Sequence, residues 1–527
     1  IMMENQLIDR IIASQSCRVI SPTDGSHKPF LISQLFKKSN RSIVVIVKNL
    51  KTAQLFLDDI VFFLPGMEDR LLLFPGYHIL PFKSLSYHKD TSTKRLAALS
   101  RILDTSAPPV LVVTIVDTIL HKLLPKNALN DYAELVLANE EIDREKLIAK
   151  LDSSGYTRTG LVEDPGEYAV RGGILDLFVP GETKPFRIEF FGDLVESVRY
   201  FSPYTQRGTK ELNEAVVIPA TETIITPDSR PHILARLREA ASKAGIDAGK
   251  TREYVNQVRQ FGRFAGIESM LSIIYEQLDT FFDYTPEDTL WILDDPGHLQ
   301  MCAAETEQKA EMNYQSTASE NRLCVSPDTL NLVWEEVTDI LLSKHHVCLV
   351  PFERADSSFD HTREIYELEY QDNTALKAQL RSDSDHQYPL TPFVSWIEDH
   401  LEKQRSVVTA ISQETQVKRL NALLQPYGIT PGPLSSIDEM NPESIGFYYI
   451  LGQLNSGFVM DRPRLALVTE GEIFRKKRIR RRKTGRKDFK TEFIAPEELK
   501  DGDFIVHIEH GVGQYQGLCS LEVNRIT

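Results

Sequence analysis

Short apolar runs alternate with helix-like spacing over the first 129 residues. The runs contain mostly Val, Ile and Leu without interruption, a pattern typical of parallel strands that are covered on both faces. Between them, apolar positions recur every three or four residues in 50–63 and 92–103, which predicts helices. The expected strands are 43–47, 71–74 and 110–115. This alternation predicts an α/β domain over residues 1–129.

A different pattern begins near Gly166 and continues to Arg207. Apolar and polar residues alternate there with a period of two, which is the period of a half-buried strand. The alternation places Arg187, Glu189 and Phe191 on one face of the sheet and their neighbours Ile188 and Phe190 on the other face. The segment 130–219 is therefore expected to be a mainly antiparallel sheet module inserted into the α/β domain.

Just before these strands, Arg171 precedes a double glycine, Gly172-Gly173, which permits a bulge or tight bend. Arg171 is expected on the same face as Arg187. That face therefore carries two arginines and one aromatic ring, whereas the opposite face buries Ile and Phe.

The rest of the chain divides by pattern into four further segments. We expect 220–350 to return to the first α/β domain, and 351–470 to form a second small α/β domain. Residues 471–494 are expected to be a basic linker, and the glycine-rich tail 495–527 an incomplete small barrel. The predicted fold class is an α/β multidomain protein.

Composition supports an ordinary globular protein. The chain has 527 residues, of which 42% are hydrophobic and 26% charged, and this length predicts about three to five domains. No apolar run approaches the roughly 18 residues that span a bilayer, and no secretory signal is visible. The five cysteines are scattered without a CxxC pair (Cys17, Cys302, Cys324, Cys348 and Cys519). We therefore expect a reducing, cytoplasmic setting and no membrane partner.

Charge is distributed unevenly. Residues 475–490 hold eleven Lys or Arg and one Asp, a net charge of +10 in a chain of net charge −15, so the remainder carries −25. A block of like charges is usually a solvated linker, although such a linker can also contact DNA phosphates without reading sequence. The candidate phosphate contacts are Arg475, Lys476, Lys477, Arg478, Arg480, Arg481 and Arg482.

The loop 21–29 occupies the place of a phosphate loop. A working loop needs Gly-x-x-x-x-Gly-Lys-Ser/Thr, so that backbone N–H groups surround the phosphates and a hydroxyl holds magnesium. Lys28 stands in register and Gly25 lies nearby, but Pro22, His27 and Pro29 replace the remaining required residues and Asp24 adds a negative charge. We expect a vestigial loop, marked by Gly25 and Lys28, that does not hydrolyse nucleotide.

Asp294-Asp295 follows the apolar run 290–293 in the manner of a Walker B motif. Such a motif holds Mg²⁺ and has an adjacent Glu that activates water, and this Glu is missing. The favoured interpretation is a strand end capped by acidic residues with no phosphate loop facing it.

The ordered segment containing AVRGG, FRIEFF and Thr205-Gln206-Arg207 closely resembles the module shared by UvrB and the transcription-repair coupling factors, the Mfd family. In those proteins the module binds the damage sensor UvrA. The resemblance implies that Arg171, Arg187 and Phe191 are the UvrA-binding residues. The opposing interpretation is that Arg171 pairs with Asp176 or Glu189 and that Phe191 is ordinary core.

The tail from Glu497 to Thr527 resembles the RNA-polymerase-interacting domain of the same family, a Tudor-like barrel also found in CarD-type regulators. The resemblance implies a contact with the polymerase β subunit at Leu521, weakened because the barrel is incomplete. His507 and His510 form a possible metal pair, but no third ligand has suitable spacing, so no metal site is expected.

Two functions follow from these resemblances. The first is the N-terminal portion of a coupling factor, which recruits UvrA to RNA polymerase stalled at DNA damage. The translocase motor of the family uses ATP and Mg²⁺ and needs a phosphate loop and a DExx box. Neither of these two motifs occurs in the 527 residues, so we expect no catalytic residues and no cofactor. The alternative is a UvrB-like ATP-dependent helicase that loads onto damaged DNA. The vestigial loop at 21–29 opposes it.

Overall fold

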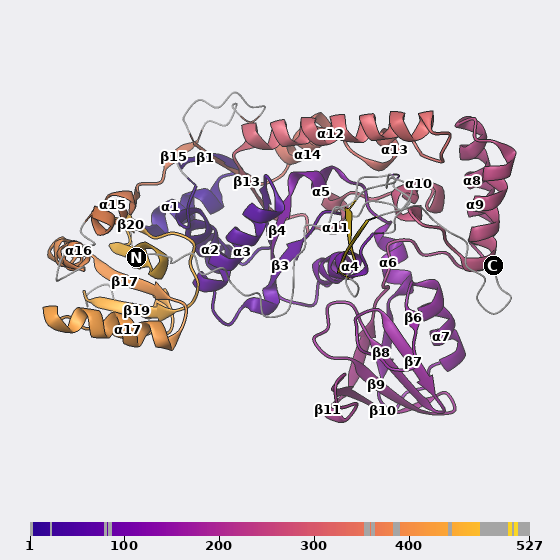
Figure 1. The fold of residues 1–527 in the computed structure, drawn as a ribbon, viewed down its shortest axis with the longest axis horizontal. Helices are drawn as coiled ribbons and strands as arrows, with labels where there is room; N and C mark the ends of the chain where they lie inside the picture. The colour runs from indigo at the N-terminus through magenta and orange to yellow at the C-terminus, as the bar shows by residue number, and fades with distance from the viewer. Residues whose placement is uncertain are drawn as a thin grey trace.

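The computed structural model describes residues 4–21, 24–77, 82, 87–351, 359, 364–382, 390–440 and 445–474, together with the strands 504–507 and 511–514. Figure 1 shows three sheet-containing parts: the central sheet lies between the second sheet, at the left, and the inserted sheet, at the lower right. The predicted DNA-phosphate contacts at 475–482 and the predicted polymerase contact at Leu521 lie outside the described residues.

The central sheet has seven strands in the order β15-β1-β14-β13-β2-β4-β3. Every neighbouring pair is parallel. Its strands are β1 (Ser16–Ile20), β2 (Ile43–Val47), β3 (Leu71–Phe74), β4 (Leu111–Ile115), β13 (Leu290–Asp294), β14 (His346–Val350) and β15 (Ile365–Glu367). The expected apolar strands are confirmed. They are apolar throughout because both faces of the sheet are covered.

Helices cover both faces of the central sheet. Alternate residues of β2 enter different cores: Val45 packs with α2 (His27–Ser39) and α3 (Leu50–Phe63), whereas Val44 packs on the opposite face. That opposite face is covered by α4 (Lys89–Leu103), α5 (Val116–Leu120), α11 (Phe281–Tyr284), α12 (Pro296–Ser319) and α14 (Trp334–Ser343). The period of two in the strand thus builds a three-layer arrangement.

The inserted sheet has six strands in the order β11-β10-β9-β8-β7-β6, and it lies between β4 and β13 in the chain. All pairs are antiparallel except β6 with β7. The strands are β6 (Thr157–Arg158), β7 (Glu167–Arg171), β8 (Ile174–Phe178), β9 (Phe186–Phe191), β10 (Leu194–Phe201) and β11 (Gly208–Leu212). A ribbon of β5 (Glu134–Leu137) and β12 (Glu214–Val217) and the helix α7 (Arg144–Ser153) complete this part, and one shared core joins them.

The segment 220–350 contains more than the expected return to the central sheet. The helices α8 (Arg230–Lys243) and α9 (Ala248–Phe261) pack together around a separate apolar cluster. Figure 1 places this pair at the end of the molecule away from the second sheet. The remaining short helices are α6 (Lys126–Tyr132), α10 (Leu271–Ile274) and α13 (Pro327–Leu330), and α1 (Glu4–Ala13) begins the described chain.

The second sheet has the order β16-β20-β21-β17-β19-β18. Its strands are β16 (Gln371–Asp372), β17 (Ser406–Ile411), β18 (Gly432–Leu434), β19 (Phe447–Leu451), β20 (Phe458–Met460) and β21 (Leu465–Thr469). Its helices are α15 (Thr374–Ser382), α16 (Thr391–Glu402), α17 (Glu414–Leu424) and α18 (Glu470–Ile473). The expected boundary at 351 falls too early, because β15 still pairs with β1 of the central sheet.

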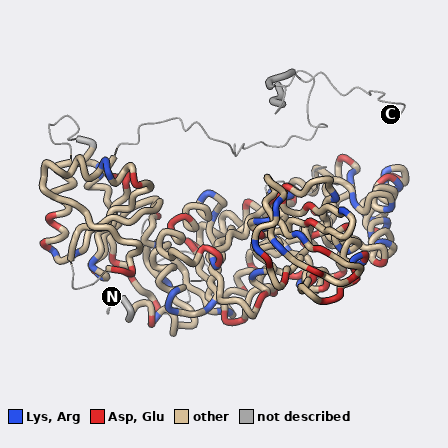
Figure 2. The backbone as a smooth tube through the Cα atoms, turned by 90° about the horizontal axis from the view of Figure 1, so that it is seen from below, with Lys and Arg blue, Asp and Glu red and all other residues tan. Residues whose placement is uncertain are grey.

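In the tail, β22 (Phe504–His507) pairs with β23 (Gly511–Gln514) as an antiparallel ribbon. The described residues of the tail contain this ribbon and no barrel. Acidic and basic residues are interspersed along the described backbone (Figure 2). Among the helices of the described chain, none has both the length and the apolar character required to cross a bilayer.

Candidate functional site

The polar face of the inserted sheet brings together the residues expected from sequence. Register pairs Asp176 of β8 with Arg187 of β9, and Arg187 with Arg199 of β10. We call this surface the arginine face, which consists of Arg171, Asp176, Arg187, Glu189, Phe191 and Arg199. The predicted alternation in β9 is confirmed, because Ile188 and Phe190 on the opposite side are buried in the core.

Asp176 is fully buried and holds both expected arginines. Arg187 donates to it through Nε and Nη2 at 2.7 and 2.9 Å, and Arg171 donates through Nη2 at 2.6 Å. This pair of hydrogen bonds from Arg187 raises the pKa of its guanidinium. Bidentate arginine–carboxylate pairs fix direction as well as distance, so Asp176 sets where both guanidinium groups lie.

Arg187 lies deeper than Arg171. Only 16% of its side chain is exposed. The guanidinium also lies 4.7 Å from the ring centroid of Phe201 and donates to the carbonyl of Gln206 at 3.1 Å. Arg187 therefore connects three strands and the following loop, and offers little free surface.

Arg171 and Phe191 supply the exposed part of the arginine face. Arg171 keeps 47% of its side chain exposed although it pairs with Asp176, and Phe191 is 74% exposed. The interpretation of Phe191 as core is therefore wrong, whereas the suggested pairing of Arg171 with Asp176 is confirmed. The two exposed groups combine a charged donor with an aromatic ring, a composition common in binding hot spots.

The double glycine shapes this edge of the face. Gly172 has φ +59°, and a Cβ on Gly173 would stand 2.6 Å from the carbonyl oxygen of Phe190. The Phe190 N–H donates to the Gly173 carbonyl at 2.7 Å. The tight bend thus lets β8 pair closely with β9 up to the residue before Phe191.

Two features of the inserted sheet and its loops were not predicted from the sequence. Tyr204, in the loop between β10 and β11, is 96% exposed, and no period marks it because it lies outside the strands. Arg199 forms an ion pair with Glu189, to which Ser197 also donates at 2.9 Å. The register across β9 and β10, which the sequence does not state, creates this pair.

In the vestigial phosphate loop, the lysine forms ion pairs with two carboxylates of the same chain. The Lys28 ammonium lies 2.8 Å from Asp294 and 3.0 Å from Asp24, and both Lys28 and Asp294 are buried. Burial alone would lower the pKa of Lys28, but the two carboxylates raise it. The expectation that no phosphate loop faces Asp294 is wrong, because Lys28 of the vestigial loop, at the start of α2, contacts Asp294 at the end of β13.

Asp295 has a structural, capping role, as the favoured interpretation of Asp294-Asp295 predicted. It is the N-cap of α12, and its carboxylate accepts from the His298 N–H at 3.2 Å. The two adjacent aspartates thus have separate structural partners.

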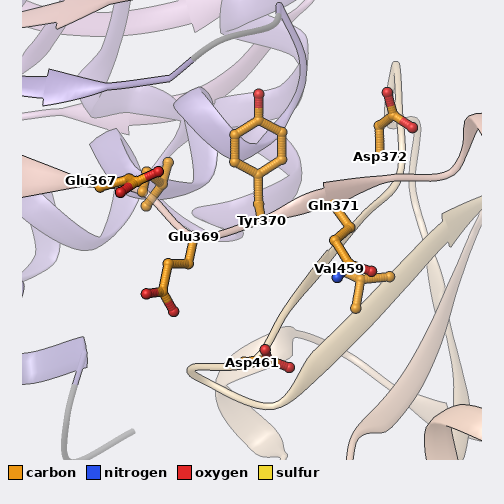
Figure 3. A pocket seen from close by; sticks show the side chains of 8 residues that line it. Glu367, Glu369, Tyr370, Gln371, Asp372, Val459 and Asp461 are labelled. Atoms are coloured by element: carbon orange, nitrogen blue, oxygen red, sulfur yellow. The ribbon is translucent and has the colours of Figure 1, made fainter. Parts of the chain in front are cut away.

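A pocket of about 470 Å³ lies where the chain passes from the central sheet to the second sheet. Tyr370 and Glu369 leave opposite sides of this connection (Figure 3). Its lining is Glu367, Leu368, Glu369, Tyr370, Gln371, Asp372, Val459 and Asp461. No group of three or more potential metal ligands occurs among the described residues.

Three family models match the chain. The UvrB interaction domain matches residues 136–222, which contain the arginine face up to Arg199. The MFD, D3 domain matches residues 401–473 in the second sheet. The CarD-like/TRCF RID domain matches residues 499–527 in the tail.

Relatives named transcription-repair-coupling factor match nearly the whole chain. The protein from Myxococcus xanthus is 29% identical over 99% of this chain and 44% of its own length. Those from Escherichia coli and Bacillus subtilis are 27% and 26% identical, each over 97% of this chain and 43% and 42% of their own lengths. The chain thus spans less than half the length of these relatives.

Proposed function

Because this chain is similar over nearly its whole length to the N-terminal part of transcription-repair-coupling factors, we propose that it is a recruitment module that binds UvrA through the arginine face. In this role it brings nucleotide excision repair to RNA polymerase stalled at DNA damage. The match to a UvrB interaction domain supports the location of the contact.

The observation that carries this proposal is the exposure of Phe191 beside Arg171 on a face fixed by buried Asp176. A large aromatic side chain left in water at a sheet edge gains by burial against a partner. Burying the exposed part of such a ring contributes about 2–4 kcal/mol. A neighbouring arginine adds directional hydrogen bonds.

We expect the two exposed residues to contact UvrA directly and Arg187 to position them. Arg187→Ala should lower UvrA affinity and also loosen the sheet, because it removes two bonds to Asp176 and one to Gln206. Phe191→Ala should lower UvrA affinity without loosening the sheet. This difference separates contact from positioning.

The test is UvrA binding to the whole 527-residue chain by surface plasmon resonance. Phe191→Ala and Arg171→Ala should each weaken binding about tenfold or more, as hot-spot residues do. Phe261→Ala is the matched control, since Phe261 is also a highly exposed Phe but lies at the end of α9. Unchanged affinity in the Arg171→Ala/Phe191→Ala double variant, with its circular dichroism intact, would refute the assignment.

The other partners are proposed from resemblance alone. The tail is proposed to contact the polymerase β subunit at Leu521, and it matches a CarD-like/TRCF RID domain. The basic residues 475–482 are proposed to contact DNA phosphates, with strong salt dependence and no sequence preference. A cytoplasmic setting suits all three partners.

We also propose that this chain does not hydrolyse nucleotide and needs no cofactor. The central α/β part is proposed to be a degenerate form of the ATP-binding domain of UvrB. Internal neutralisation of Lys28 by Asp24 and Asp294 supports this, because the charge that would meet a phosphate already has two partners. Tight Mg²⁺-dependent ATP binding in calorimetry would instead favour the UvrB-like alternative.

A further inference from the structure

Two residues of the former phosphate loop contact the second sheet and the connection that leads to it. Ser26 exchanges two hydrogen bonds with Ser456: each backbone N–H donates to the other serine's hydroxyl at 3.0 Å. His27, which stands where the loop needs its second glycine, stacks on Tyr370 with ring centroids 3.6 Å apart. Both Ser26 and His27 are buried. The altered loop therefore makes a specific contact with a segment some 430 residues later in the chain.

We call residues 452–457 the docking loop. Besides Ser456, it contains Asn455, whose backbone N–H and side-chain Nδ2 both donate to Asp59 Oδ1 at 2.9 Å. The Asn455 amide also donates to the carbonyl of Leu55 in α3 at 3.1 Å. At the start of the loop, a Cβ on Gly452 would stand 2.6 Å from the Phe62 ring. The docking loop thus follows α3 and ends at the N-terminus of α2.

Beneath these polar contacts, the two sheets share one apolar core. Phe458 of β20 lies against Phe30 of α2 and Phe63 of α3, with ring centroids 5.6 and 6.4 Å apart. Residues of β17 and β21 belong to the same buried cluster as residues of β2 and β4. An interface of this kind resembles the interior of one domain more than a hinge between two.

We propose that the docking loop of the second sheet is a built-in ligand of the former phosphate loop, and that the second sheet fixes the central domain in one conformation independently of nucleotide. In an ATP-binding protein, phosphate groups satisfy the N–H groups at this helix start. Here Ser456 bonds the Ser26 N–H, and Asp24 and Asp294 neutralise Lys28. The former phosphate loop is therefore held by partners from within the chain, where a nucleotide-binding loop would be held by phosphate.

This role goes beyond UvrA recruitment and does not depend on it, because the arginine face lies on a different sheet. It assigns a task to the second sheet, in whose contacts we find no catalytic constellation among the described residues. We expect the central and second sheets to unfold together, as one cooperative unit.

The first test is hydrogen exchange on the whole chain. In Asn455→Ala/Ser456→Ala, amide exchange over residues 26–32 should be about tenfold faster, because the helix start loses its partners. Ser412→Ala is the matched control: it removes an exposed serine hydroxyl of the second sheet whose partner is Glu470. Exchange at 26–32 as slow as in the wild type would overturn the proposal.

A second pair of variants distinguishes loss of this contact from general damage to the fold. Asn455→Asp places a second carboxylate against Asp59 and should speed exchange at 26–32. Adding Asp59→Asn restores an amide–carboxylate pair with the groups exchanged, and should recover most of the protection. Failure of this rescue would overturn the proposal. So would slower exchange over residues 24–28 of the wild type when Mg²⁺-ATP is added, since the site would then still accept nucleotide.

Discussion

The replacement Asp176→Asn tests how the arginine face is built. Asparagine has nearly the volume of aspartate and keeps one acceptor oxygen, so the change removes charge without opening a cavity. It leaves Arg187 with a neutral partner and places an N–H donor where an acceptor stood. Arg171 and Arg187 then also repel each other across the face.

The magnitude follows from the three hydrogen bonds that Asp176 accepts. Hydrogen bonds to charged groups contribute about 1.5–3 kcal/mol each, and Arg187, whose side chain is 16% exposed, makes two of them. Arg171 is half exposed, and water replaces most of its bond, so its share is about 0–1 kcal/mol. Because one oxygen remains, we expect a loss of about 2–4 kcal/mol in local stability.

Native-state hydrogen exchange at the amides of β8 and β9 measures this loss within a chain of several parts. Glu189→Gln is the matched control, because its partner Arg199 and Glu189 itself are each about one-third exposed, and a solvent-exposed pair contributes about 0–1 kcal/mol. Asp176→Asn should also weaken UvrA binding. An Asp176→Asn chain within about 0.5 kcal/mol of the wild type would refute this account of the face.

Two further predictions concern pH and backbone space. Burial and the charge of Arg405 lower the pKa of His400 to about 4. On acidification the unfolded chain binds the proton before the folded chain does, so the stability is full above pH 6.5 and falls between pH 6.5 and 4 by up to about 3 kcal/mol. In His400→Gln, the urea midpoint should depend less on pH across this range. An equal pH dependence of the urea midpoint in both chains would contradict the assignment. Gly173→Ala should cost about 1–3 kcal/mol in thermal denaturation, because its Cβ would meet the Phe190 carbonyl at 2.6 Å. Gly160→Ala, in open space, should change little, and equal effects of the two would refute the steric argument.

Much of the fold was accessible from local pattern. Continuous apolar runs such as Ile43–Val47 mark buried parallel strands, and the alternation in Phe186–Phe191 assigns each side chain to a face. Helix boundaries at Leu50 and Phe63 also followed from spacing. The pair α8 and α9 was missed, because its apolar positions pack on each other and on neighbouring short helices instead of on a sheet.

The sequence predicted which residues make up the candidate site but not how exposed each side chain is. Period two placed Arg171, Arg187 and Phe191 on one face, yet it does not tell an exposed residue from one covered by a loop. Arg187 is largely covered because the Gln206 carbonyl reaches it, whereas Phe191 is exposed at the strand end. Exposure depends on neighbours far apart in sequence, so only the folded chain decides it.

By itself, the sequence determined which residues carry the face and that the loop at 21–29 lacks the residues for nucleotide chemistry, because period and residue type are local properties. The tertiary structure decided what replaced that chemistry. Lys28 meets Asp294 across 266 residues of chain, and Ser26 meets Ser456 across 430. Contacts over such separations arise from strand order and sheet packing, and no local pattern records them.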